Sequence, residues 1–181
     1  MQFNVAQLLK EHTGQTRQFI LHEDLSQLDP EIAPLSTLDG AVRLIRTTDG
    51  ILVTGKLRCS LELSCSRCLE LFSLPLQFVL EEEFRPTIDI VTGANLPVLA
   101  EDESATRIDE HHMLNLSEVV RQNMLLAIPP SPVCRTKCAG LCPNCGKNWN
   151  EGRCECESDE IDPRFLVLRQ LLDNGTQTKN N

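Results

Sequence analysis

Hydrophobic and polar residues alternate over a long central stretch of the chain. From residue 51 to residue 65 the apolar residues take the odd positions, with Leu52 as the exception. From residue 72 to residue 84 they take the even positions. A period of two is typical of an antiparallel strand with one buried face. The pattern therefore predicts two long strands joined by a short turn that contains Cys65 and Cys68.

The preceding segments add further strands and a short helix. Asp49-Gly50 stands between two apolar runs and favours a hairpin turn. Residues 16–25, "TRQFILHEDL", predict another strand, and residues 3–14, "FNVAQLLKEHTG", predict a helix that ends near Gly14. Consecutive hairpins with one buried face predict an α+β fold, in which an antiparallel β meander curls into a barrel-like domain or packs on a helix.

The second half of the chain changes character several times. Residues 81–112 are acidic and predict a long surface excursion. Residues 114–130, "LNLSEVVRQNMLLAIPP", predict a helix with Ser117 as its N-cap and a stop at the two prolines. Residues 162–175, "DPRFLVLRQLLDNG", predict a C-terminal helix. We therefore expect a mainly β domain over 1–128, a cysteine-rich module with a helix over 129–175, and a disordered tail over 176–181.

Composition fits one ordinary core with a small appendage. The chain has 181 residues, of which 41% are hydrophobic, and no apolar run approaches the roughly 18 residues of a membrane-spanning helix. The N-terminus lacks the features of a signal peptide, so we expect a cytoplasmic protein. In a reducing compartment nine cysteines are better explained by metal binding or burial than by disulfides. A formal net charge of −9 argues against coating RNA by bulk electrostatics.

Six of the cysteines lie within "CRTKCAGLCPNCGKNWNEGRCEC", where "CPNCG" has the spacing of a zinc knuckle. An all-thiol set without histidine favours one structural zinc ion in a closed tetrahedral site. A tetrahedral site has four ligand positions, and six thiols are available for them. The favoured ligands are Cys138, Cys142, Cys145 and Cys154, with Cys134 and Cys156 able to substitute for them. An iron–sulfur cluster and simple buried thiols are the less favoured interpretations.

Cys65 and Cys68 form a second thiol pair, in "CSRCLE". The pair fits a second half-site for metal, a redox pair, or two buried thiols at the end of the sheet. Cys59 falls on the buried face of its strand and is predicted to be part of the core.

Basic residues outnumber acidic ones, four to two, within the cysteine module. Four thiolates around one zinc ion add two negative charges, so the segment comes close to neutral and its metal serves first to fold it. Any RNA contact is then local. The candidate contacts are Arg135, Lys137, Lys147, Trp149 and Arg153.

With "CSRCLE", the cysteine module and "DPRFLVLRQLL" in this order, the sequence resembles the YceD family, known as large ribosomal RNA subunit accumulation proteins. The likeness covers roughly residues 40–172. It implies a role in ribosome biogenesis, through processing or accumulation of large-subunit ribosomal RNA, and it brings no catalytic residues with it. We therefore expect a protein that is not an enzyme.

Two hypotheses of different classes follow. The first is an assembly factor that binds large-subunit ribosomal RNA or its precursor, a large-subunit ribosomal protein, or both, without a membrane or a small-molecule substrate. The second is a thiol-based metal-handling or redox protein. A zinc hydrolase is disfavoured because an all-thiol site leaves no open position on the metal.

Overall fold

The computed structural model describes residues 1–30, 32–97 and 104–156, and the chain divides into two compact units, Met1–Cys138 and Ala139–Asn181. The boundary between the units follows Cys138, whereas the sequence predicts a division after residue 128. The predicted C-terminal helix and tail lie outside the described residues. Each unit is considered by itself below.

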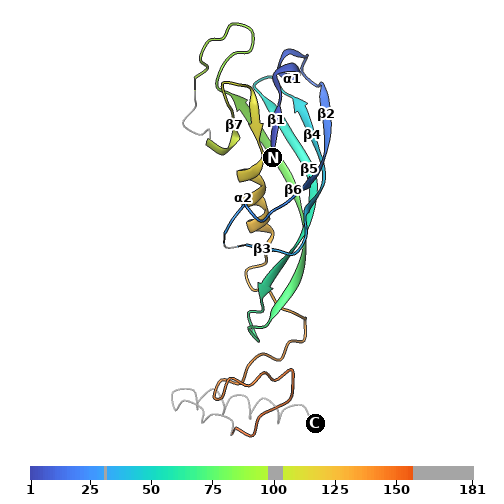
Figure 1. Cartoon of the computed structure of the whole chain (residues 1–181), viewed down its shortest axis with the longest axis vertical. Helices are drawn as coiled ribbons and strands as arrows, with labels where there is room; N and C mark the ends of the chain where they lie inside the picture. Colours follow the sequence, from blue (N-terminus) through green and yellow to red (C-terminus); the bar gives the residue numbers. More distant parts are fainter. Residues whose placement is uncertain (31, 98–103, 157–181) are drawn as a thin grey trace, which may run out of the picture. The chain divides into compact units, whose positions relative to one another are not determined.

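The first unit is built on an antiparallel meander, as the alternation predicts (Figure 1). Its strand order is β2-β4-β5-β6-β7, with β3 added on β5 and with β7 parallel to β6. Over the described residues this sheet is open and does not close into a barrel. The strands are β2 (Thr16–Glu23), β3 (Ala33–Pro34), β4 (Leu38–Arg46), β5 (Ile51–Ser64), β6 (Leu71–Pro86) and β7 (Arg107–Ile108).

Smaller elements complete this unit. β1 and β8 pair with each other as a separate two-stranded sheet. The predicted N-terminal helix is present and is short. These elements are β1 (Gln2–Asn4), α1 (Ala6–Lys10), the 3-10 helix η1 (Ser104–Thr106), β8 (Met113–Asn115) and α2 (Ser117–Ala127).

The pairing of β5 with β6 explains why the apolar positions change from odd to even. The register places odd-numbered residues of β5 opposite even-numbered residues of β6, from Ile51 opposite Phe84 to Cys59 opposite Leu76. Residues directly opposite each other point to the same side of a sheet. The two apolar sets therefore form one buried face, on which Ile51 and Phe84 are fully buried.

Helix α2 lies along one face of the sheet, and Figure 1 shows it beside β6. Its buried side chains are Val119, Val120 and Met124. The Met124 sulfur lies 3.8 Å from the Cys59 sulfur, which confirms Cys59 as a core residue. On the opposite face Ile20 and Val79 are 85% and 57% exposed, so the sheet meets solvent at both positions.

Two details differ from the sequence prediction. Ser117 is the first residue of α2 and not its N-cap, because Leu116 occupies the cap position without a side-chain hydrogen bond. The Asn115 carboxamide accepts the Ser117 backbone N–H instead, at 3.0 Å. The acidic stretch, residues 81–112, is not entirely a surface excursion either, because β6 continues into it as far as Pro86. Burial of Phe84 extends the strand to that point.

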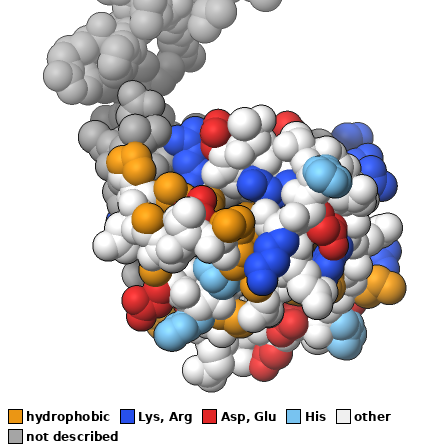
Figure 2. Space-filling view, turned by 90° about the horizontal axis from the view of Figure 1, so that it is seen from above, with side chains coloured by type: hydrophobic (Ala, Val, Ile, Leu, Met, Phe, Trp, Pro, Cys, Tyr) orange, Lys and Arg blue, Asp and Glu red, His pale blue; other side chains and the backbone are white. Residues whose placement is uncertain are grey.

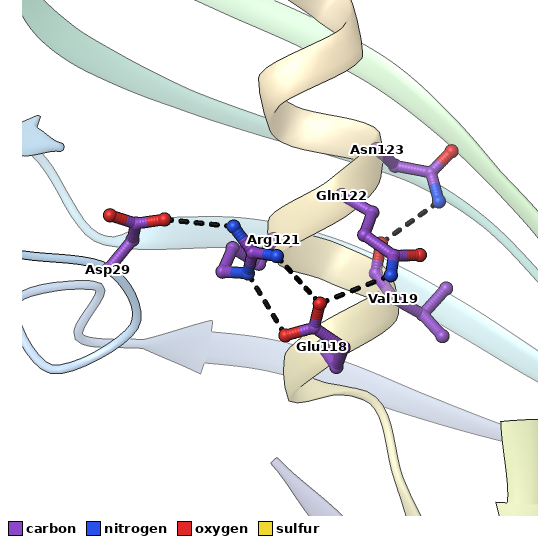
Figure 3. Close-up of polar contacts among 6 residues, drawn as sticks. All are labelled: Asp29, Glu118, Val119, Arg121, Gln122 and Asn123. Atoms are coloured by element: carbon purple, nitrogen blue, oxygen red, sulfur yellow. Dashed lines mark hydrogen bonds and ion pairs between the residues drawn. The ribbon is translucent and has the colours of Figure 1, made fainter. Parts of the chain in front are cut away.

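Arg121 connects α2 to the loop after β2 (Figure 3). Its guanidinium donates to Asp29 at 3.0 Å and to both Glu118 carboxylate oxygens at 2.9 and 2.7 Å. Those hydrogen bonds hold the pKa of Glu118 below its usual value and raise the pKa of Arg121. The Asp29 side chain is only 12% exposed, so its ion pair is the better shielded of the two.

Replacing Arg121 by Met is expected to lower the free energy of unfolding by about 1–3 kcal/mol, since the shielded Asp29 carboxylate loses its arginine. Urea denaturation at neutral pH measures the change. Because the pKa of folded Glu118 is depressed, its contribution is present at neutral pH and is lost as the pH falls through that lowered value. The deficit should therefore shrink in acid. Arg43→Met, on the exposed sheet face, is the matched control, and equal losses in both variants would contradict this assignment.

Candidate functional site: two groups of four cysteines

All nine cysteines lie within the described residues, and eight of them gather in two groups of four. Within each group every sulfur lies within 4.8 Å of the others. The first thiol group is Cys65, Cys68, Cys134 and Cys138. The second thiol group is Cys142, Cys145, Cys154 and Cys156. The first belongs to the first unit and the second to the second unit.

The first thiol group joins the turn between β5 and β6 to the segment that follows α2. Hydrogen bonds to backbone carbonyls hold the two segments together: the Ser66 N–H donates to the Pro132 carbonyl at 2.8 Å, and the Arg67 guanidinium donates to the Cys138 carbonyl at 3.0 Å. The Cys134 N–H also points at the Cys65 sulfur, 3.4 Å away. The thiols are therefore brought together by contacts that do not involve metal.

The second thiol group is organised by the predicted knuckle. The Gly146 N–H donates to the Cys142 carbonyl and the Cys142 N–H to the Lys147 carbonyl, both at 2.9 Å. Gly146 has a φ of 71°, in the left-handed region that glycine adopts without strain. A β-bridge between residues 141 and 148 closes the hairpin around the knuckle itself. Residues 149–152 form a separate turn, in which the Gly152 N–H donates to the Trp149 carbonyl at 3.4 Å.

The spacing of the sulfurs fits one tetrahedral thiolate-bound ion per group. A Zn–S bond of about 2.3 Å in a regular tetrahedron separates the sulfurs by roughly 3.8 Å. In the first group the Cys65–Cys138 and Cys68–Cys134 sulfur distances are 3.9 and 3.7 Å. Thiolates that ligate different irons of a cluster lie farther apart than those around a single ion. Four thiols also fill every place in a tetrahedral site, which is the arrangement of a structural metal.

The thiols within each group influence one another's protonation. Burial opposes ionisation of Cys65, but backbone N–H donors, first that of Cys134, lower its pKa to about 6. Its neighbour Cys68 behaves in the opposite way. A backbone hydrogen bond near Glu70 lowers the pKa of Cys68, but burial and the surrounding thiols outweigh it and raise the pKa to about 12.

In the second thiol group, too, one cysteine has a lowered pKa and another a raised pKa. The Trp149 indole N–H donates to the Cys154 sulfur at 3.5 Å and is the main cause that lowers the pKa of Cys154 to about 6. Hydrogen bonds with Cys145 and Cys154 raise the pKa of Cys156 to about 12. Four thiolates this close repel one another, so full ionisation of either group calls for a cation among them.

The structure groups the thiols differently from the favoured ligand set. Cys138 belongs to the first thiol group, whereas Cys142, Cys145 and Cys154 belong to the second. Cys134, expected as a substitute ligand, lies in the first group with Cys138. Cys156 completes the second. The local spacing gives no sign that "CSRCLE" pairs with cysteines so much later in the sequence, because the elements from β6 to α2 intervene.

The predicted RNA contacts are all exposed, and they divide between the units. Arg135 and Lys137 belong to the first unit, and Lys147, Trp149 and Arg153 to the second. The Lys147 ammonium donates to the Arg153 carbonyl at 3.4 Å. Trp149 is 36% exposed and its N–H is directed to sulfur, so its ring both supports the thiol group and meets solvent.

Charged residues also line a hollow of about 480 Å³ beside the β4–β5 turn. Arg46, one of its three arginines, donates to two backbone carbonyls of that turn at 2.6 and 2.8 Å. Arg85 pairs with Glu83 at 3.7 Å, and Asp89 accepts hydrogen bonds from its own loop. Figure 2 shows one face of the chain, on which charges of both signs are interspersed. These contacts assign Arg46, Arg85 and Asp89 to local structure, and the expectation of a non-enzymatic protein stays a prediction.

In the part of the chain that the structure describes, no helix is both long enough and apolar enough to cross a membrane.

Fold and site together define a class, an α+β protein with an open antiparallel sheet and cysteine clusters that can bind metal. The model of one protein family, described as "Large ribosomal RNA subunit accumulation protein YceD", matches residues 53–172, more than half of the chain. The chain belongs to the YceD family. That membership supports a ribosome-related role and confirms the resemblance drawn from the three sequence motifs.

Individual proteins are also similar to this chain. Uncharacterized proteins of Mycobacterium bovis and Mycobacterium tuberculosis are each 31% identical over 141 residues, which cover 78% of this chain and 65% of the relative. The chain therefore spans less than two thirds of their length. The chloroplastic large ribosomal RNA subunit accumulation protein YCED homolog 1 of Arabidopsis thaliana is 30% identical over 64 residues, 35% of this chain and 20% of that protein. No solved structure matches the chain.

Trp149→Phe is expected to weaken metal binding several-fold to about tenfold at neutral pH, because it removes the N–H that stabilises the Cys154 thiolate and keeps the ring. Loss of that donor raises the pKa of Cys154, so protons should displace metal at a higher pH than in the wild type. A chromophoric zinc chelator followed during acid titration measures both effects. If Trp149→Phe binds like the wild type and only Trp149→Leu is weaker, ring packing rather than the hydrogen bond is responsible.

Proposed function

We propose that this protein is a non-enzymatic ribosome biogenesis factor that supports processing or accumulation of large-subunit ribosomal RNA in the cytoplasm. It does so by binding ribosomal RNA or its precursor, a large-subunit ribosomal protein, or both. The observation that carries the proposal is the family match over residues 53–172, which includes β6, α2 and both thiol groups. The name of the Arabidopsis relative points the same way.

Zinc is the metal we propose for the second thiol group, in a structural role. Support comes from its all-sulfur donors, which suit zinc, and from the four-fold set, which leaves no place for a substrate. The segment is also short and polar, so metal binding supplies folding free energy that a small core does not.

Charge favours local contacts over a broad RNA-binding surface. The chain has a formal net charge of −9, and each ion held by four thiolates adds about two further negative charges. In the second unit Lys147 and Arg153 offer positive charge beside the partly exposed ring of Trp149, a combination that suits a single-stranded RNA segment. The acidic remainder suits a basic ribosomal protein.

A thiol-based metal-handling or redox protein is the second candidate function. Exposure of Cys145 and Cys156 favours it, because exposed thiols exchange metal and oxidise more readily than buried ones. Thiol titration alongside zinc measurement separates the two functions. Tightly held zinc with unreactive thiols rejects the redox function, and labile zinc with a reversible disulfide supports it.

Depletion of the protein in its host is expected to lower large-subunit ribosomal RNA relative to small-subunit RNA and to reduce the large-subunit peak in sucrose gradients. Quantification of both RNAs and the gradient profile measure the effect, and restored expression of the wild-type chain is the control. Unchanged RNA ratios and gradients after depletion would show the proposal to be wrong.

In-cell crosslinking with sequencing of bound RNA separates the two kinds of partner. Replacing Lys147 and Arg153 together by Gln is expected to reduce RNA crosslinks several-fold, because two exposed positive charges beside Trp149 are lost. The matched control, Lys10→Gln with Arg43→Gln, makes the same charge change elsewhere on the exposed surface. Equal crosslinking in both double variants, with recovery of a ribosomal protein, would assign binding to the protein partner instead.

A further inference from the structure

The turns at the two C-x-x-C motifs have the same backbone hydrogen bonds. In the second thiol group the Gly146 N–H donates to the Cys142 carbonyl at 2.9 Å, and the Cys142 N–H to the Lys147 carbonyl at 2.9 Å. In the first group Leu69 N–H donates to the Cys65 carbonyl at 2.9 Å, and the Cys65 N–H to the Glu70 carbonyl at 2.9 Å. Position by position, "CSRCLE" folds as "CPNCGK" does.

The correspondence includes an unusual backbone conformation. Gly146 has a φ of 71°, and Leu69, at the same place in its turn, has a φ of 61°. The left-handed region is unfavourable for leucine, whose β-carbon crowds the backbone there. Leu69 is also 65% exposed, so side-chain burial does not account for its position. A strained residue persists only where its surroundings fix it, and converging thiols with a shared ion are surroundings of that kind.

The remaining two thiols of the first group complete a tetrahedral set. Cys134 and Cys138 come from the segment after α2, and their sulfurs lie 3.7 Å from Cys68 and 3.9 Å from Cys65 respectively. The Cys134 N–H donates to the Cys65 sulfur, and backbone donors of this kind stabilise a metal-bound thiolate. The first thiol group thus has the four sulfur donors, the sulfur spacing and the supporting hydrogen bond that a separate metal ion requires.

We propose that the turn "CSRCLE" is a second zinc knuckle and that Cys65, Cys68, Cys134 and Cys138 bind a zinc ion separate from that of the second thiol group. The ion cross-links the β5–β6 turn to the segment that follows α2. Because the linked cysteines are far apart in the sequence, the cross-link restricts a long loop of the unfolded chain as a disulfide does. This inference deepens the structural-zinc part of the proposed function.

Metal counting on the purified full-length protein tests the proposal. Native mass spectrometry and elemental analysis should give two zinc ions per wild-type chain, one in Cys65→Ser/Cys68→Ser and one in Cys145→Ser/Cys156→Ser. Cys59→Ala, which removes a buried thiol outside both groups, is the matched control and should keep two. A single ion in the wild type, loss of both ions in either double variant, or iron in place of zinc would overturn the proposal.

Substitutions at Leu69 keep the test valid if a cysteine variant does not fold. In the full-length protein, Leu69→Gly should bind zinc in the first thiol group at least as tightly as the wild type. Leu69→Val should bind it roughly tenfold more weakly, because a β-branched residue tolerates the left-handed region worst. Leu126→Val, an exposed leucine on α2, is the control and should leave the affinity unchanged. Equal affinities across the Leu69 series would overturn the knuckle. Since both experiments measure metal and not ribosomes, their failure is distinguishable from failure of the proposed function.

Discussion

Pairing of β5 with β6 is the constraint on which the first unit depends. The two strands are hydrogen-bonded from Ile51 opposite Phe84 to Ser64 opposite Leu71. A register fixed over that length puts every inward side chain on one face, because a slip by one residue would turn all of them to solvent. It also fixes the turn at the far end of the hairpin. Cys65 and Cys68 are thereby held by the same ladder that forms the core.

Patterns within a single element were readable from the sequence, whereas contacts between distant segments were not. Alternation predicted β5 and β6, and the two prolines after Ile128 predicted the end of α2. The grouping of Cys65 with Cys134 depends on how the hairpin and α2 fold back, which no local spacing encodes. Ser117 departs from its predicted role for a local reason, because the Asn115 carboxamide accepts the Ser117 N–H at the start of α2.

The two C-x-x-C turns differ in how far the sequence alone predicts them. The glycine of "CPNCG" identifies its left-handed turn at sequence level, because glycine is the residue that adopts it freely. "CSRCLE" has leucine at that position. Because leucine rarely adopts the left-handed conformation, residue preferences do not predict this turn. The conformation becomes visible only through the hydrogen bonds of Leu69 and Cys65. The same turn can therefore form without its most recognisable residue.

Two thiolate-bound zinc ions would also change how the protein meets its partners. Each site adds negative charge to a chain that is already acidic, so metal loading strengthens attraction to basic proteins and weakens nonspecific attraction to phosphate. An RNA contact must then depend on a few positioned groups, such as the Trp149 ring with Lys147. Because the Trp149 indole also donates to Cys154, a metal ion bound by Cys154 would be coupled to the position of that ring. A zinc ion in the second thiol group would therefore act on an RNA contact through the position of Trp149 as well as through its charge.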